Sequence, residues 1–270
     1  MKIITNILAY VLVALIIEGI AYGCTSLVNR VNDPKGPLYT ATSSSKDSEG
    51  KTFRTVTLGS REWMAANLNV ISFRDGSDIR EATTQADWLA AFDRKEPVWA
   101  WITNDAAVGK TYGRIYNWYA ITDPRGLAPT GWTIPDSSDW MHLARSARLA
   151  GTICLNDDGD TDVEGDFDAR VLQLTDVEWT NPDLFGFDRS GTNLAGFNAL
   201  PGGMIGVDGI AGSLEMETGW WGRDGLIMRI GNHSHAAEHD AVAFYQHRNT
   251  PAGCYVRCVR TAAGQDSAHP

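Results

Sequence analysis

The most informative stretch of the sequence reads GLAPTGWTIPDSSDWMHLARSA, residues 126–147. Its first half predicts a loop, because a proline and two glycines favour turns around one large anchor, Trp132. Its second half predicts a helix, because four apolar residues recur at helical spacing. Asp136 or Ser137 can cap this helix, and Gly151 is expected to end it. A tryptophan-anchored loop that runs into a short helix indicates a loop-rich fold.

The composition agrees with that prediction. The chain has 270 residues, of which 27 are glycine and 10 are tryptophan. This mixture excludes a disordered chain and a coiled coil, and it disfavours a helical bundle, since glycine destabilises helix interiors. We therefore expect an irregular α+β domain whose loops are held by buried aromatic side chains.

Working outward, two strands and a second helix are expected. Residues 52–58 alternate in polarity and predict a strand, residues 84–94 predict a helix, and residues 253–259 predict the last strand. No internal repeat is present. The tryptophans expected in the core are Trp63, Trp118, Trp132 and Trp140.

The amino terminus predicts export. Residues 1–24 comprise a short apolar run after a single lysine, ending at small residues before Cys24. This resembles a lipoprotein signal in which Cys24 is lipidated; a plain secretory signal and an uncleaved anchor are the alternatives. Residues 25–50 are expected to be a polar tether, residues 51–261 the domain, and residues 262–270 a disordered tail.

Three further cysteines, Cys154, Cys254 and Cys258, would then lie in a compartment that permits disulfides. Cys254 and Cys258 are four residues apart, so on one strand they face the same side and are too distant to bridge easily. We expect Cys154 to pair with one of them, and the sequence does not say which.

The formal net charge is −10, and residues 151–190 alone carry eleven acidic residues against two arginines. Acidity and export together argue against a nucleic-acid partner. Alternating carboxylates at Asp158, Asp160 and Asp162 suggest calcium, but the EF-hand spacing fails. An acidic solvated loop is the competing interpretation. Apart from this calcium alternative, the sequence predicts no cofactor.

Residues 222–252 contain four of the six histidines. We interpret this segment as a ligand-binding face, because Tyr, His, Asn and Arg give adaptable hydrogen bonds. An ordinary solvated surface is one alternative, and a zinc site at His235, His239 and Asp240 is another. The candidate ligand-binding residues are Trp221, Arg223, Asp224, Asn232, His233, His235, His239, Asp240, Tyr245, His247 and Arg248.

Six tryptophan- and glycine-centred motifs occur in order along residues 50–260. They are EWMAANLN (62–69), YGRIYNWYA (112–120), GLAPTGWTIPD (126–136), GFNALPGG (196–203), GWW (219–221), and Gly253 with VRCV (256–259). In this order the chain resembles the Fibrobacter succinogenes major paralogous domain, a family of bacterial surface lipoproteins. Ala128 departs from the family pattern, which has a cysteine there.

The resemblance implies a single C-type-lectin-like domain of short twisted strands, about two helices and extensive ordered loops. It also implies likeness to the formylglycine-generating enzymes and to the target proteins of diversity-generating retroelements, which display a variable carboxy-terminal patch. Trp220 and Trp221 adjoin the proposed display region, so partial exposure of one of them and burial of both are equally weighted alternatives.

Three functions follow as hypotheses. The first is a non-enzymatic, lipid-anchored surface module that presents residues 222–252 to an extracellular protein or glycan. The second is a structural or adhesin component of the cell envelope. The third is an oxidoreductase that resembles formylglycine-generating enzymes and acts through Cys254 and Cys258. No phosphate loop, nucleophile elbow or zinc-protease motif supports catalysis.

Overall fold

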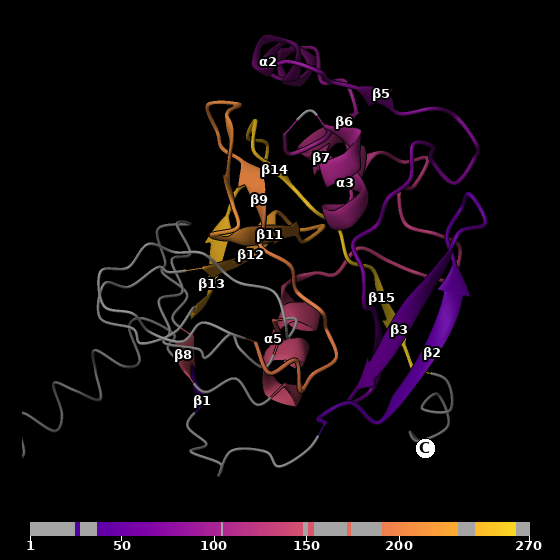
Figure 1. Ribbon diagram of the computed structural model, residues 1–270, viewed down its shortest axis with the longest axis vertical. Helices are drawn as coiled ribbons and strands as arrows, with labels where there is room; N and C mark the ends of the chain where they lie inside the picture. Colours follow the sequence, from indigo (N-terminus) through magenta and orange to yellow (C-terminus); the bar gives the residue numbers. More distant parts are fainter. Residues whose placement is uncertain are drawn as a thin grey trace, which may run out of the picture.

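Fifteen short strands and four helices make up the described part of the chain in a computed structural model (Figure 1). The structure describes residues 25–27, 37–103, 105–147, 151–153, 172–173, 191–231 and 241–262. Its mixed content confirms the α+β class. The expected number of helices, about two, is too low.

A four-stranded antiparallel sheet has the order β15-β4-β3-β2. Its strands are β2 (Ala41–Lys46), β3 (Thr52–Leu58), β4 (Arg61–Met64) and β15 (Val259–Thr261). β3 lies where the sequence predicts it. The predicted tether is wrong over 41–46, because β2 pairs with β3 along all six of its residues. Nearly all side chains of β2 are exposed, so the polarity alternation that marks a half-buried strand is missing.

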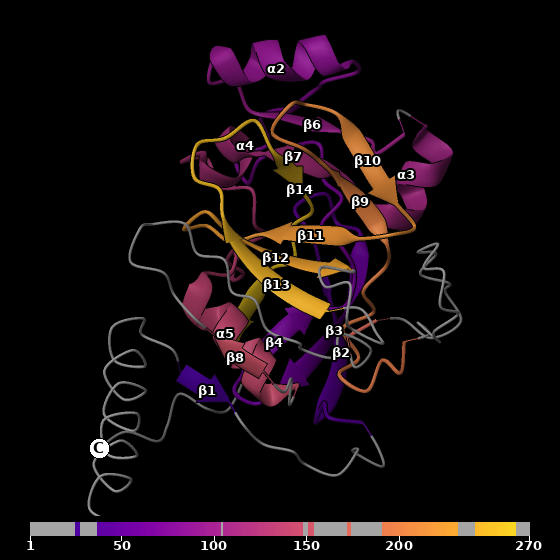
Figure 2. The same cartoon turned by 90° about the vertical axis from the view of Figure 1, so that its left-hand side faces the viewer.

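A nine-stranded mixed sheet has the order β13-β12-β11-β9-β14-β7-β6-β5, and β10 pairs with β9 off this path (Figure 2). Its strands are β5 (Arg80–Glu81), β6 (Val98–Ala100), β7 (Ile115–Asn117), β9 (Gly202–Ile205), β10 (Ala211–Leu214), β11 (Thr218–Trp221), β12 (Leu226–Gly231), β13 (Ala241–Gln246) and β14 (Gly253–Cys254). A separate pair joins β1 (Thr25–Leu27) and β8 (Gly151–Ile153).

The strand predicted over 253–259 is broken into two pieces that belong to different sheets. β14 pairs in the nine-stranded sheet, whereas β15 pairs with β4 in the four-stranded sheet. Between them the carbonyls of Val256 and Cys258 accept from the N–H groups of Leu68 and Met64, at 2.8 and 3.0 Å. The chain therefore crosses from one sheet to the other at this point, which the polarity pattern alone does not show.

Two of the helices confirm the sequence prediction. α2 (Gln85–Asp93) is capped by Thr84, and α5 (Ser137–Ser146) is capped by Asp136. α5 ends before the predicted Gly151, because Gly151 is already the first residue of β8. The other two, α3 (Ala106–Tyr112) and α4 (Trp118–Thr122), are short and were not predicted.

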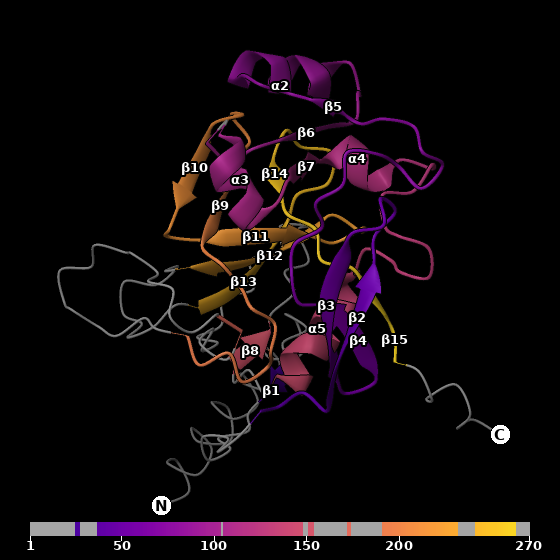
Figure 3. The same ribbon diagram turned by 45° about the vertical axis from the view of Figure 1, so that its right-hand side comes forward.

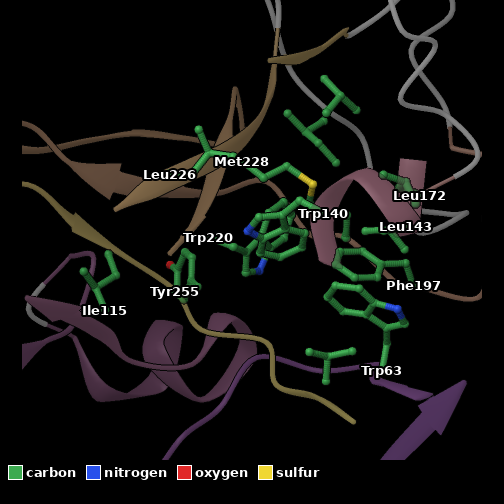
Figure 4. Packing of buried hydrophobic residues seen from close by; sticks show 14 of the residues in the cluster. Trp63, Ile115, Trp140, Leu143, Leu172, Phe197, Trp220, Leu226, Met228 and Tyr255 are labelled. Carbon is green, nitrogen blue, oxygen red and sulfur yellow. The ribbon is translucent and has the colours of Figure 1, made fainter. Parts of the chain in front are cut away.

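The core consists of two clusters of buried side chains. In the first, Trp63 stacks on Trp140 from α5 at 5.1 Å between ring centroids, and Phe197 packs edge-on against Trp63 and Trp220 (Figure 4). Met228 from β12 points into the same cluster (Figure 4). Because α5 contributes to this cluster together with strands of both sheets, the helix joins the two sheets.

Three of the four tryptophans expected in the core are confirmed there. Trp63, Trp132 and Trp140 are buried, whereas Trp118 is half-buried and lies edge-on against Trp221, with ring centroids 5.8 Å apart. Trp118 opens α4 directly after the buried Asn117, whose side chain caps that helix. It therefore stands at the rim of the second cluster.

Candidate binding face

The turn between β11 and β12 presents Arg223 and Asp224. The Gly222 N–H donates to the carbonyl of Leu226 at 2.6 Å, and the Gly225 N–H donates to the carbonyl of Gly222 at 2.9 Å. Gly225 has φ +87°, a left-handed conformation that glycine adopts without strain. The backbone thus fixes the turn, and the Arg223 side chain is left 56% exposed.

The first turn of α5 holds this β-turn from one side. The Arg223 N–H donates to the carbonyl of Pro135, and the Ser137 N–H donates to a carboxylate oxygen of Asp224, both at 2.8 Å. The Arg223 guanidinium also pairs with the Asp136 carboxylate. The loop–helix stretch 126–147 therefore positions the turn.

The end of β13 holds the same turn from the other side. The His247 N–H donates to the carbonyl of Gly225 at 2.8 Å. The carbonyl of Asp224 accepts from the Gln246 side-chain amide at 3.0 Å and from the Arg248 Nε. These bonds bring Arg248 beside Arg223, although the two are far apart in sequence.

Tyr245 extends the polar surface along β13. Its ring lies 6.4 Å from the His247 ring, and the Arg229 guanidinium of β12 lies 4.9 Å from the Tyr245 ring centroid. Arg229 pairs with Glu217, and both side chains are mostly buried, at 23% and 16% exposure. Tyr245 therefore sits over a semi-buried ion pair, which fixes its ring.

The three arginines near this surface differ in whether a carboxylate pairs with them. Arg223 and Arg229 each have a carboxylate partner. Arg248 is exposed, and its Nε donates to the backbone carbonyl of Asp224; among the described residues it forms no ion pair with a carboxylate. An exposed guanidinium is suited to bind a negatively charged group on a ligand.

The structure thus gathers five of the predicted ligand-binding residues on one surface, which we call the carboxy-terminal face: Arg223, Asp224, Tyr245, His247 and Arg248. Five others lie outside the described residues: Asn232, His233, His235, His239 and Asp240. The proposed zinc and calcium ligands and the lipidation site Cys24 lie outside them too. Among the described residues no cluster of three or more metal-ligating side chains occurs.

The prediction that Trp221 binds a ligand is wrong. It is fully buried, and its indole N–H donates to the carbonyl of Tyr116 at 2.8 Å. The preceding Trp220 is equally buried but belongs to the other core cluster. Successive residues of a strand point to opposite faces, and both faces of β11 are covered, so neither indole reaches a ligand on the surface.

Sequence reasoning missed three residues that position the face: Glu217, Arg229 and, in this role, Asp136. Asp136 was recognised only as a helix cap. Arg229 is the only charged residue in the apolar strand β12, and this isolation is a usable signal, because a charge within a buried strand needs a partner. Nothing in the sequence pairs it with Glu217 specifically.

The two carboxy-terminal cysteines are free thiols, so the expected disulfide from Cys154 to one of them is not formed. Cys254 and Cys258 lie in the same core cluster, consistent with their predicted common side. Burial raises the pKa of both thiols, which disfavours the reactive thiolate.

In the described part of the chain, no helix has the length and apolarity needed to span a membrane.

Comparisons with known proteins identify one relationship. No curated protein and no solved structure matches the sequence. The model of one family, the Fibrobacter succinogenes major domain, matches residues 56–260, which run from within β3 into β15. The chain therefore belongs to the Fibrobacter succinogenes major domain family.

Proposed function

We propose that this chain is an exported bacterial surface module that binds an extracellular protein or glycan through its carboxy-terminal face. One observation carries the proposal. The turn and strand end that form the face are fixed by backbone hydrogen bonds, while Arg223 and Arg248 remain exposed. Exposed side chains on a turn that is fixed by its backbone are available for recognition.

The chemistry of the face supports an anionic ligand group. Arg248 has no carboxylate partner among the described residues, and the exposed Arg223 pairs with the half-buried carboxylate of Asp136. Tyr245 and His247 add flat, amphipathic surface beside these cations. Carboxylates and sulfates on glycans, or acidic side chains of proteins, match guanidinium groups of this kind.

The double variant Arg223→Ser/Arg248→Ser tests the proposal. We expect binding to an array of neutral, sialylated and sulfated glycans, or to a phage-displayed peptide library, to fall by at least about tenfold. The melting temperature should change by no more than about 3 °C, because the lost ion pair is at the surface. Both quantities are measured on the purified full chain.

The matched control is Lys46→Ser/Arg54→Ser, which removes two exposed cations from β2 and β3. It should leave binding unchanged. Equal losses in the two double variants would show that net charge and not this face is responsible. A collapse of the fold in Arg223→Ser/Arg248→Ser would show that these side chains are structural.

Finer features of the proposal rest on the family likeness. We propose a C-type-lectin-like scaffold, a lipid anchor at Cys24, and variation of the face by a diversity-generating retroelement. A reverse-transcriptase gene next to an adenine-biased near-repeat of the codons for 220–260 would support the last feature, and its absence would remove it. Loss of palmitate labelling in Cys24→Ala tests the anchor.

A structural role in the cell envelope is the second candidate, and a partner that co-purifies in fixed stoichiometry would favour it. The oxidoreductase alternative has less support, because both thiols that it would use are fully buried. We therefore propose a non-enzymatic role, in which the face binds and does not react.

A further inference from the structure

A cavity of about 280 Å³ lies between the start of α2, the end of β6 and the β9–β10 hairpin. Figure 3 shows α2 at one end of the molecule, with the hairpin and α3 beneath it. None of the residues that line the cavity belongs to the carboxy-terminal face. This volume is close to the lower bound of about 300 Å³ for small-molecule sites, so the cavity has room for no more than a single ring-sized ligand.

The walls of the cavity are held in place by contacts outside it. The Gln85 side-chain amide donates to the carbonyl of Asp208 at 2.9 Å, which ties α2 to the tip of the hairpin. The Trp88 indole N–H donates to the carbonyl of Pro251 at 2.6 Å. Gly209 lies so close to α2 that a Cβ there would stand 2.8 Å from the Cγ of Leu89.

Trp101 is fixed in a similar way. The Arg114 guanidinium lies 4.4 Å from its ring centroid, and α3 packs Gly109 directly on its six-membered ring. Because all these contacts are between groups of the protein itself, the fold fixes the walls of the cavity, and binding does not require the walls to be ordered first.

The lining is mostly apolar, with a few polar groups and no charged side chain. Besides Trp88 and Trp101 it contains three threonines and a glutamine, with alanine, isoleucine and glycine completing the wall. Thr83, Gln85 and Thr103 are exposed residues, and among the described residues no hydrogen bond is found for the two hydroxyls or for the side-chain carbonyl of Gln85. The cavity therefore offers unused donors and acceptors beside apolar surface.

This combination discriminates among ligand classes. An apolar ligand would strip water from the hydroxyls without replacing its hydrogen bonds. A charged ligand would lose its hydration and meet no counterion. A ring that carries hydroxyl groups around its edge and C–H groups on its faces satisfies both kinds of surface.

We propose that this cavity binds one neutral sugar ring, as a free glycoside or as the end residue of an uncharged glycan. The proposal goes beyond the function of the carboxy-terminal face and does not depend on it. Arg223→Ser/Arg248→Ser should therefore leave this site intact, so failure at one site is distinguishable from failure at the other.

Saturation-transfer NMR of the full chain with the methyl glycosides of glucose, galactose, mannose and N-acetylglucosamine tests the proposal. At least one should bind with a Kd of about 1 mM, the affinity that a ligand of this size reaches at ordinary efficiency. Ala211→Phe should abolish the signal, because Ala211 is an exposed residue in the cavity lining. Ala41→Phe is the matched control, since Ala41 is likewise the exposed first residue of a strand.

Thr103→Val removes one hydroxyl at nearly constant shape and should weaken binding about threefold to tenfold. Thr42→Val, on the exposed strand β2, should have no effect. Glucuronate should bind at least about tenfold more weakly than the best glycoside, and cyclohexanol should not compete with it.

Three results would each overturn the proposal. One is that no glycoside binds at up to about 50 mM. Another is that Ala211→Phe binds as tightly as the unmodified chain, which would put the sugar elsewhere. The third is that glucuronate or cyclohexanol binds as well as the neutral sugars.

Discussion

Arg257 belongs to the last of the ordered sequence motifs and contacts residues of three others. Arginine is ordinarily expected at the surface, but this side chain is in the core. It is 1% exposed, and its Nε donates to the Asn67 side-chain oxygen at 2.8 Å. Its other nitrogens donate to the carbonyls of Phe197 and Asn198, and the guanidinium lies 4.2 Å from the Phe197 ring centroid. Trp220 donates to the same oxygen of Asn67 at 2.8 Å. Burial lowers the pKa of Arg257, and these acceptors and rings offset that cost.

Arg257→Lys keeps the charge but loses the planar fork of donors. We expect the free energy of unfolding in urea to fall by about 2–4 kcal/mol, because several buried acceptors lose their donors. Arg54→Lys, at an exposed position of β3, should change it by less than about 0.5 kcal/mol. A change of similar size in both variants would contradict the structural role given to Arg257.

Predictions for single residues are confirmed where the residue type has one predominant structural role, such as burial of a large aromatic side chain. The buried Trp63, Trp132 and Trp140 belong to this group. Two glycines of the ordered motifs, Gly113 and Gly203, have left-handed φ values of +91° and +71°. Gly202 does not, and it is small because Tyr255 fills the space of a Cβ. A buried arginine and a close approach of this kind depend on distant neighbours, which one sequence does not reveal.

At the scale of elements, Asp136 connects α5 to the carboxy-terminal face. Its side chain accepts from the Asp139 N–H at 3.1 Å, and the Asp139 side chain accepts in return from the Asp136 N–H at 3.2 Å. Burial opposes ionisation of Asp136, but the Ser138 hydroxyl, the Asp139 N–H and Arg223 together lower its pKa to about 2.

This shift predicts acid sensitivity. The folded pKa lies below the reference value of 3.8, so the unfolded chain takes up the proton first. The stabilising contribution is complete above about pH 4 and is lost as the pH falls toward about 2. Asp136→Asn keeps a capping oxygen but cannot titrate, so urea unfolding should show about 1 kcal/mol less acid loss than in the unmodified chain. Parallel pH curves for the two proteins would refute this.

Sequence reasoning found α2 and α5, which have a cap and a helical period together, and β3, which has an alternating pattern. α3 and α4 are too short to show a period. β2 has no period because nearly all its side chains are exposed. The break between β14 and β15 comes from a change of sheet, which is a property of the tertiary structure and not of the local pattern.

At the scale of the whole molecule, the two sheets should unfold as one unit. Cys254 lies in the nine-stranded sheet and Cys258 directly precedes β15 of the four-stranded sheet, yet both are buried in one cluster. In a Cys24→Ser/Cys154→Ser background, thiol labelling in graded urea followed by mass spectrometry should modify both at the same rate. Labelling of one thiol at lower urea than the other would show that the sheets open separately.

The paired tryptophans of β11 set a rule for how this protein can change over generations. Trp220 and Trp221 enter opposite cores, so a one-residue shift of β11 against its neighbouring strands would send each indole to the wrong side. Exchanging Arg223, His247 or Arg248 for another residue leaves that alternation untouched. Changes of side chain in the face are therefore compatible with the core, whereas a change in the register of β11 is not.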